Sequence, residues 1–300
     1  MTFPDFAALP QPVGVVAHDA GAANLLAAWV AEAGQGPLRC CLAGPAGAIF
    51  ARHVSSLQLL PLEELVGQCR TIISGTGWAS DLEHEARLRG RRAGCLNIAV
   101  VDHWTDYRAR FTRSGQEVLP DAIWVADADA LRLAQAEFPG LAVTEWSNAY
   151  LQGQVAAVLR REPDYADRAS HVLYLLEPIR DDWGALPVPG EFLALDYFVH
   201  QLAALALPQP VRLRLRPHPS DPAGKYDAWL RANAALQPQL DATSTLEESL
   251  AWSGTVAGCQ TYAMVVALAA GRRVVCTIPP GRPACALPQA GIVCLAQLDA

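Results

Sequence analysis

Lysine is nearly absent from this chain of 300 residues: Lys225 is the only one, so arginine carries almost all of the positive charge. The formal net charge is −7. Nucleic acids and acidic membrane surfaces favour broad basic patches, so this balance argues against nucleic acid as a partner. Local anion sites are not excluded, because the planar guanidinium of arginine binds phosphates and carboxylates through two parallel hydrogen bonds.

Several motifs with a known mechanism are also missing. The eight cysteines form no CxxC pair and no Cys/His cluster at zinc-finger spacing, which argues against a zinc site and favours reduced, buried thiols. There is no GxGxxG fingerprint, Walker A loop, GxSxG elbow or HExxH pair. A dinucleotide oxidoreductase is therefore disfavoured, and we expect neither a bound cofactor nor a catalytic metal.

Long uninterrupted apolar runs are lacking as well. The best candidate, "EFLALDYFVHQLAALALP" (191–208), contains Asp196 and His200, so it predicts an amphipathic or buried helix and no transmembrane segment. The N-terminus has no basic region followed by an apolar core, as a secretory signal would. We therefore expect a cytoplasmic protein. Peripheral membrane association and the oligomeric state stay open.

Short apolar runs rich in β-branched residues alternate with Ala- and Leu-rich helical stretches, which predicts βαβ units around parallel sheets. The pattern predicts strands at 13–18, 37–44, 71–75, 95–102, 122–127, 141–146, 171–178, 211–216, 255–258, 272–279 and 291–297. We predict an α/β fold of two Rossmann-like doubly wound domains facing a cleft. Residues 1–150 form the first, 151–170 a linker and 171–300 the second. Ligands of such sheets bind outside the carboxyl ends of the strands.

The first strand end of the N-terminal half is "VVAHDAGAANLL". His18 and Asp19 follow the strand, and Gly21 lets the chain approach a ligand closely where a helix begins. Asp19 either caps this helix or belongs to a site.

The next strand end, "ISGTGWASDLEHEARL", combines a flexible elbow at Gly75 and Gly77 with Trp78 at its tip and Asp81 beyond it. An exposed tryptophan beside small polar residues suits the stacking of a sugar ring, although packed tryptophans are commoner. We expect His84, on the following helix, to face solvent.

The third strand end is "AVVDHWTDYRARF". Asp102 and His103 are suited to general-base chemistry, and Trp104 follows them directly. Adjacent residues of an extended strand point to opposite sides, so Asp102 and His103 need not act on one atom.

In the C-terminal half, "VRLRLRPHPSDP" is a strand that ends at Arg216 and continues into a proline-bracketed His218, with Ser220 close behind. Proline fixes its own φ and biases the preceding residue toward extended conformations, so the imidazole is presented from a stiff loop. The alternative is a plain turn.

A further strand ends in "TVAGCQTYAMVVALAAG". Gly258, Cys259, Gln260 and Thr261 precede an apolar helix, whose first amides and hydroxyl suit an anion or a ribose. The alternative is a helix simply capped by Thr261. No His/Asn pattern supports Cys259 as a nucleophile.

One more strand end, "YLLEPIRDDWG", presents Glu177. Asp181 and Asp182 follow it, and they fit a solvated acidic loop better than a metal site.

These features together resemble a family. The order "LEP", then "RLRPHPSD", then "TLEESLAWSGTVAGCQTYAMVVALAAGRRVV" is similar to GT-B-type glycosyltransferases, in particular polysialyltransferase-like and CDP-glycerol glycerophosphotransferase-like enzymes. His218 and Pro219 match the His-Pro pair of those families. Gly258, Gln260 and Thr261 match loosely their glycine loop, which carries a serine or threonine nearer the glycine. The N-terminal motifs also resemble proteins of bacterial surface-polysaccharide clusters.

The resemblance implies a metal-independent transfer of sugar from a nucleotide-sugar donor to a carbohydrate acceptor. It assigns three sets of roles. The donor is bound by Arg216, His218, Ser220, Glu177, Gly258, Cys259, Gln260 and Thr261. The acceptor is bound by His18, Gly75, Gly77, Trp78, Asp81 and Trp104. Catalysis falls to Asp102 or Asp19 as the base, with His103 as a substitute.

Two other functions fit the same pattern. One is a nucleotide-sugar hydrolase or 2-epimerase, which turns over the donor without an acceptor. The other is a non-catalytic carbohydrate- or nucleotide-binding protein, because a fold alone does not determine activity.

Overall fold

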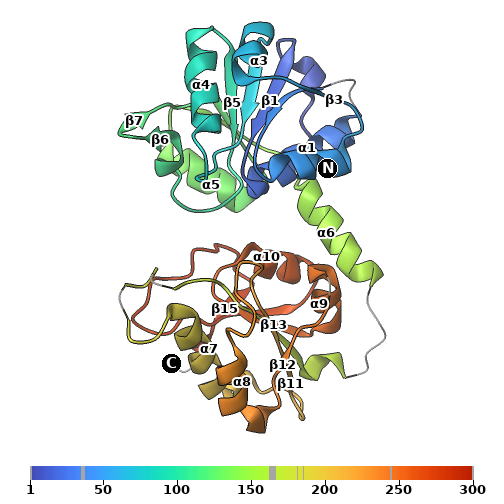
Figure 1. Cartoon of the computed structure of the whole chain (residues 1–300), viewed down its shortest axis with the longest axis vertical. Helices are drawn as coiled ribbons and strands as arrows, with labels where there is room; N and C mark the ends of the chain where they lie inside the picture. The colour runs from blue at the N-terminus through green and yellow to red at the C-terminus, as the bar shows by residue number, and fades with distance from the viewer. Residues whose placement is uncertain are drawn as a thin grey trace. The chain divides into compact units, whose positions relative to one another are not determined.

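The computed structural model describes residues 2–34, 38–161, 167–180, 182–184, 186–243 and 245–298. The chain divides into two compact units, Met1–Tyr150 and Leu151–Ala300 (Figure 1). Each unit has its own parallel β-sheet and its own hydrophobic core. Helix α6 (Ala149–Arg160) begins at the end of unit 1 and continues into unit 2.

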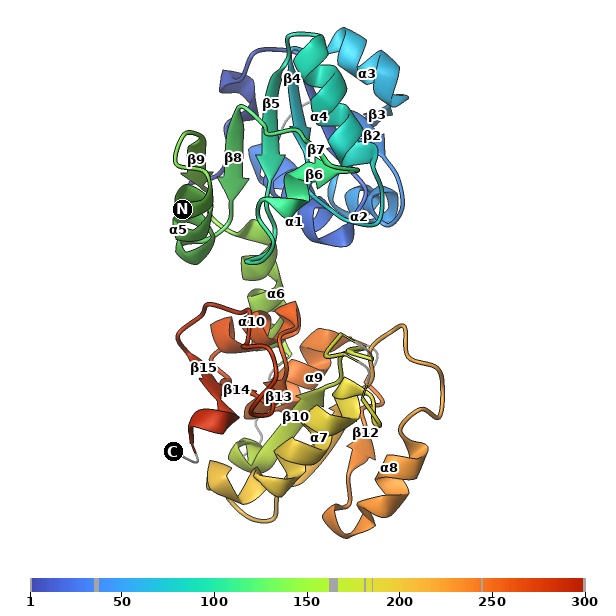
Figure 2. The same cartoon turned by 90° about the vertical axis from the view of Figure 1, so that its left-hand side faces the viewer.

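Unit 1 is built on a seven-stranded sheet with the spatial order β3-β2-β1-β4-β5-β8-β9 (Figure 2). Every neighbouring pair in it is parallel. The strands are β1 (Val13–Ala17), β2 (Leu38–Leu42), β3 (Leu57–Leu59), β4 (Thr71–Ser74), β5 (Leu96–Val100), β8 (Ala122–Val125) and β9 (Ala142–Glu145). A separate antiparallel ribbon pairs β6 (Thr112–Arg113) with β7 (Gln116–Glu117).

The helices of unit 1 cover both faces of its sheet. They are α1 (Ala20–Ala33), α2 (Ala46–His53), α3 (Leu62–Gln68), α4 (Leu82–Arg92) and α5 (Ala128–Glu137). Successive residues of a strand point to opposite faces. Accordingly Val15 of β1 belongs to the apolar cluster with α1 and α2, whereas Val16 belongs to the cluster with α3 and α4.

Unit 2 is built on a six-stranded parallel sheet with the order β12-β11-β10-β13-β14-β15. The strands are β10 (His171–Leu175), β11 (Arg212–Arg216), β12 (Gln239–Leu240), β13 (Thr255–Gly258), β14 (Arg273–Cys276) and β15 (Ile292–Cys294). The helices are α7 (Gly190–His200), α8 (Asp227–Ala232), α9 (Leu246–Trp252) and α10 (Tyr262–Ala269). A capping box of Thr245 and Glu248 starts α9.

Short 3₁₀ segments complete both units: η1 (Phe6–Ala8), η2 (Ala109–Phe111), η3 (Arg168–Ser170), η4 (Leu202–Leu205), η5 (Ala234–Leu236) and η6 (Leu295–Gln297). In the described part of the chain, no helix combines the length and the apolar character needed to cross a membrane.

Counted along each unit, both sheets have the strand order 3-2-1-4-5-6, with β9 added at one edge of unit 1. This is the order of the Rossmann fold, so the predicted pair of Rossmann-like α/β domains is confirmed. The strand order reverses between β1 and β4 in unit 1 and between β10 and β13 in unit 2. Those two switch points are where a ligand is expected.

The segment between β2 and β4, which has no assignment from the sequence, forms α2, β3 and α3. One expectation was wrong. His84, expected to face solvent, is 4% exposed, because α4 lies against β1, β4 and β5. Burial lowers the pKa of His84, and the nearby Arg87 and Arg113 lower it further.

Candidate functional site

The switch point of unit 1 brings His18 and Asp19 against the elbow that follows β4. Oδ2 of Asp19 accepts hydrogen bonds from the amides of Trp78 (2.6 Å) and Ala79 (3.2 Å). Asp19 has the N-cap position of α1, but within the described chain its side chain forms no capping bond to that helix. The capping interpretation is therefore wrong for the carboxylate, which instead fixes the Trp78 loop.

His18 and Asp19 form a close pair, with His18 Nδ1 and Asp19 Oδ1 2.6 Å apart. Burial raises the pKa of the Asp19 carboxyl, but hydrogen bonds from His18, Ala79 and Trp78 outweigh it, so that this pKa lies below its ordinary value. An ionised carboxylate only accepts hydrogen bonds, so Nδ1 of His18 carries the proton. Nε2 of the neutral ring is then a proton acceptor, which is the arrangement of a general base and its orienting carboxylate.

Glu83 of α4 is a buried carboxylate beneath this pair that the sequence reading missed. It accepts hydrogen bonds from the amides of His18 (3.0 Å) and Gly77 (2.5 Å). Burial raises its pKa, although these two bonds counteract the effect. Glu83 thus ties β1 to the elbow after β4.

The glycines of the elbow are required by close approach. A Cβ at Gly75 would overlap the Glu83 carboxylate, and one at Gly77 would overlap Asp19. Both glycines were expected to bind the acceptor; in the structure they make room for carboxylates of the chain itself. The same holds for Gly21, where a Cβ would overlap Asp102.

Asp102 and His103 have different partners, as the strand geometry suggested. Asp102 lies against Gly21 and forms an ion pair with buried Arg110 (Nη1 to Oδ1, 3.3 Å). Nδ1 of His103 contacts the Thr105 hydroxyl at 3.3 Å. Burial lowers the pKa of His103, which favours the neutral ring.

Trp78 is 50% exposed at this switch point, as expected for a side chain that contacts a ligand. Two arginines lie over its ring, Arg113 at 5.1 Å and Arg110 at 5.6 Å from the centroid. Arg113 also donates to the carbonyl of Gly77 and pairs with exposed Asp81 at 3.5 Å. Arg110 belongs to the polar loop predicted after the "AVVDHW" strand, but it was assigned no role from the sequence, and Arg113 was missed; their spacing after the "DHWTD" strand end was the available signal.

Trp104 was expected to bind the acceptor, and the structure corrects this expectation. It is 7% exposed, and its indole N–H donates to both carboxylate oxygens of Asp127 (3.1 and 3.0 Å). A buried ring whose polar group is already satisfied does not offer a face to a sugar, so we remove Trp104 from the candidate site.

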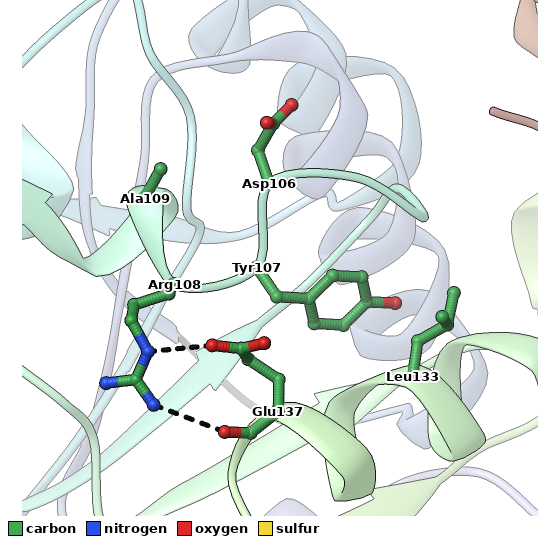
Figure 3. A pocket seen from close by; sticks show the side chains of 6 residues that line it. All are labelled: Asp106, Tyr107, Arg108, Ala109, Leu133 and Glu137. Carbon is green, nitrogen blue, oxygen red and sulfur yellow. Dashed lines mark hydrogen bonds and ion pairs between the residues drawn. The ribbon is translucent and has the colours of Figure 1, made fainter. Parts of the chain in front are cut away.

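The rest of the polar loop after β5 is structural. A concavity of about 320 Å³ lies between this loop and α5, and Figure 3 shows Arg108 reaching across it to Glu137. Arg108 binds Glu137 (2.7 Å) and Glu117 (2.8 Å), while the buried Tyr107 hydroxyl donates to the carbonyl of Ala130 (3.4 Å). These contacts hold the loop to α5 and β7 and account for its polarity.

In unit 2 the switch point joins Glu177, after β10, to the segment after β13. Glu177 Oε1 accepts from the amides of Cys259 (2.7 Å) and Gln260 (2.9 Å). Burial raises the pKa of Glu177, and the amides of Gln260, Cys259 and Thr261 oppose that rise. The amides at the start of α10 that were expected to bind a donor anion are therefore engaged by a carboxylate of the same unit.

Two alternatives at this strand end can be judged. Thr261 has the N-cap position of α10, but in the described residues its hydroxyl forms no capping bond. Cys259 is buried, and burial together with Glu177 raises its pKa far above the ordinary value, so a nucleophilic thiolate is disfavoured there. Asp181, one of the two acidic residues after Glu177, lies outside the described residues.

His218 is exposed in the loop that follows β11. Its Nδ1 accepts from the amide of Ser220 (3.2 Å) and contacts the Ser220 hydroxyl (2.8 Å). The proton of the neutral ring therefore lies on Nε2, which is left as a donor. The His218 amide itself donates to Asp221 Oδ2 (3.0 Å), so the loop is held on both sides of the imidazole.

The His218 loop is anchored by the single lysine. Lys225 Nζ lies 2.6 Å from Asp221 Oδ1 and 2.6 Å from Glu191 Oε1 of α7, and both carboxylates are buried. The Tyr226 hydroxyl also donates to Asp221 (3.1 Å). The loop is thus stiffened by a buried ion-pair network as well as by its prolines.

Arg216 is held by polar groups around β12. Its Nη1 binds buried Asp241 (2.7 Å) and the Ser249 hydroxyl (2.7 Å), and contacts the Thr243 hydroxyl (3.2 Å). Part of its charge is therefore neutralised within the unit. Arg216 is the last residue of β11, so its guanidinium comes from the carboxyl end of this strand, where a donor contact was expected.

The fold defines the chain as a protein of two Rossmann-like domains, and solved structures share it. One is HepE of Anabaena in complex with UDP, at 12% identity over 89% of this chain and 80% of that one, with a TM-score of 0.52. The glycotransferase of kitacinnamycin is also similar, at 13% identity over 89% of this chain and 80% of that one, with a TM-score of 0.48. HepE in complex with UDP and glucose is similar at 13% identity over 87% of this chain and 80% of that one, with a TM-score of 0.48. No protein-family model and no curated protein sequence matches the chain.

Proposed function

We propose that this protein is a glycosyltransferase of the GT-B type, which transfers a sugar from a nucleotide-sugar donor to a carbohydrate acceptor. The observation that carries the proposal is the His18–Asp19 pair at the switch point of unit 1. A neutral imidazole oriented by an ionised carboxylate can take the proton of an acceptor hydroxyl. The likeness of the fold to HepE, which was solved with UDP, supports a nucleotide-linked donor.

In this proposal His18 replaces Asp102 as the base. Asp102 pairs with Arg110 and lies against Gly21, whereas no hydrogen bond from the described residues occupies Nε2 of His18. The acceptor oxygen forms a bond to the anomeric carbon as the bond from that carbon to the phosphate oxygen breaks. The hydroxyl proton passes to His18, and the nucleotide leaves with the electron pair. Trp78 stacks on the acceptor sugar.

Unit 2 is proposed to bind the donor. The leaving phosphate gains negative charge, which a preorganised donor can stabilise. Nε2–H of His218 and the guanidinium of Arg216 supply such donors without a metal or cofactor. Ser220 and the segment from Gly258 to Thr261 complete the set of donor-binding residues. Glu177 either moves away from the amides of this segment when the donor binds or contacts the nucleotide itself.

The His218–Pro219 motif is the basis for a more specific proposal about the family and the biological role of the protein. We propose a relation to polysialyltransferase-like and CDP-glycerol glycerophosphotransferase-like enzymes. We further propose a role in bacterial surface polysaccharide or glycoconjugate synthesis, carried out in the cytoplasm. The motif and the Arg216–His218 spacing support this relation.

The test is nucleotide binding followed by turnover. Melting temperatures are measured with CMP, CDP, UDP and GDP, because a bound ligand stabilises the folded state. One nucleotide should raise the melting temperature of the wild type and of the control His200→Gln, an exposed histidine of α7. In His218→Gln this increase should be much smaller. If no nucleotide stabilises the protein, the donor-site assignment is wrong.

Turnover of the matching nucleotide sugar distinguishes the alternatives. Nucleotide release that depends on an added saccharide supports a transferase. Release or isomerisation without a saccharide identifies a hydrolase or epimerase. Binding without any consumption of donor identifies a binding protein.

A further inference from the structure

Strand β11 carries two arginines, Arg212 and Arg214, that the proposed reaction does not use. Arg212, Arg214 and Arg216 alternate with Leu213 and Leu215, which are buried in the core of unit 2. Alternation along a strand places the three guanidinium-bearing side chains on one face of the sheet.

The three arginines differ in their partners. Arg216 binds buried Asp241, and Arg212 pairs with Asp167 at 3.3 Å. Arg214, by contrast, makes no hydrogen bond and no ion pair with the residues that the structure describes. Its guanidinium lies over the ring of Trp252, 3.9 Å from the centroid.

Trp252 is itself held in place. Its ring stacks on buried His171 with centroids 4.5 Å apart and an interplanar angle of 13°, and its carbonyl lies 3.0 Å from His171 Nδ1. The guanidinium therefore rests on a rigid aromatic support, which fixes its plane and leaves the N–H donors at its edge free.

Arg214 lines a pocket of about 270 Å³. Arg212, Arg214, Gln237 and Gln239 contribute its polar side chains and Trp252 lies in its wall, and none of the described residues that line it is acidic. Gln237 has a φ of 49°, an uncommon value for a residue other than glycine, asparagine or aspartate. In a chain of net charge −7, this is a local concentration of hydrogen-bond donors and positive charge.

We infer that this pocket, lined by Arg212, Arg214, Gln237 and Gln239, binds the phosphate group of a small ligand at a second site in unit 2. A fixed guanidinium binds two oxygens of a phosphate through parallel N–H donors. The amides of Gln237 and Gln239 add neutral donors around the remaining oxygens. The pocket lies toward the amino end of β11, whereas His218 follows its carboxyl end, so the two sites are separate.

Free phosphate and a phosphate monoester share this chemistry, and both are used as probes. Melting temperature is titrated with inorganic phosphate, with glucose 6-phosphate, and with chloride at matched ionic strength. We expect a saturable increase for a phosphate-bearing probe above that for chloride. Tighter binding of glucose 6-phosphate would identify a monoester as the ligand, and equal binding would identify the phosphate group alone. An equal response to chloride would overturn the proposal.

Variants locate the site. Arg214→Gln should weaken phosphate binding at least about tenfold, which corresponds to about 1.4 kcal/mol for a lost charge-assisted pair. Arg231→Gln, which removes an exposed arginine of α8, should bind like the wild type. Arg214→Gln should keep its nucleotide response, whereas His218→Gln should show a much smaller nucleotide response and keep phosphate binding. Unchanged phosphate affinity in Arg214→Gln would overturn the inference without affecting the proposed donor site.

Arg214→Lys serves if the glutamine variant does not fold. It keeps the charge but loses the planar, bidentate fork. We expect it to bind phosphate more weakly than the wild type at an unchanged melting temperature without ligand. Full affinity in this variant would show that charge alone acts, and would also overturn the inference.

Discussion

Glu177 places its carboxylate on the backbone amide of Gln260, with Oε1 and Oε2 2.9 and 3.1 Å from the nitrogen. The start of α10 would otherwise be a suitable anion site. A phosphate that binds there has to displace this carboxylate, so Glu177 controls access to the amides.

Replacing Glu177 by alanine tests this control. Two amides lose a charged acceptor, so we expect the free energy of unfolding in urea to fall by about 1–3 kcal/mol. The freed amides should make UDP raise the melting temperature more in Glu177→Ala than in the wild type. Asp227→Ala, an exposed acid of α8, should show neither effect. An equal UDP response in all three proteins would contradict control by Glu177.

The base assignment predicts a loss of turnover without a loss of donor binding. His18→Gln should lower kcat by about 10²–10⁴-fold, the usual contribution of a general base, while the nucleotide-induced shift in melting temperature stays unchanged. His53→Gln, at the exposed end of α2, is the control and should retain activity. Near-normal kcat in His18→Gln would return the role to Asp102.

The lowered pKa of Asp19 predicts the direction of a pH effect on stability. The stabilisation from ionised Asp19 is complete above its ordinary value of 3.8 and is lost as the pH falls through the lower folded value. The stability difference between wild type and Asp19→Asn should therefore be constant near neutrality and shrink in acid. Denaturation in urea from pH 7 to pH 2 measures it, with Glu32→Gln as an exposed control on α1. A difference that grows in acid would be inconsistent with this account.

Lys225 is expected to react slowly with amine reagents. Its ammonium is held between Asp221 and Glu191, so native protein should acetylate mainly at the N-terminus, whereas urea-unfolded protein should acetylate at both amines. Intact-mass and peptide measurements distinguish the two sites readily, because the chain has no other lysine.

Removing the same charge should destabilise unit 2. Lys225→Met removes the only cation paired with the buried carboxylates of Asp221 and Glu191 among the described residues. We expect a loss of about 3 kcal/mol, the lower end for a broken buried pair because the ammonium is partly exposed. The additional change Glu191→Gln should restore part of the loss. No change in stability would show that the network does not anchor the His218 loop.

Cys285 should be the cysteine that alkylates fastest. It is partly exposed, and the neighbouring Cys276 thiol lowers its pKa below the ordinary thiol value. Burial raises the pKa of the Cys40 and Cys41 thiols, and the neighbouring Cys285 thiol raises the pKa of Cys276. Since the thiolate is the nucleophile, iodoacetamide at neutral pH followed by peptide mass analysis should find Cys285 modified first. Equal rates at Cys41 and Cys285 would contradict the expected order.

The sequence determined the fold of both units, because apolar periodicity decides which segments become buried strands and covering helices. It also located the strand ends at His18, Gly75 and Asp102 in unit 1 and at Glu177 and His218 in unit 2. The parallel strands of each sheet bring their carboxyl ends to the same edge of that sheet. The short segment containing α2, β3 and α3 was missed because its strand is three residues long and mostly exposed.

Tertiary structure alone decided which of these side chains work together. Glu83 reaches the His18 amide across 65 positions, and Glu177 reaches Gln260 across 83, contacts that no local pattern encodes. Trp104 is buried and is therefore not a candidate ligand contact, whereas Trp78 is exposed, although both tryptophans follow strand ends. Local propensity depends on neighbouring residues, whereas hydrogen-bond partners and burial depend on which distant segments pack against one another.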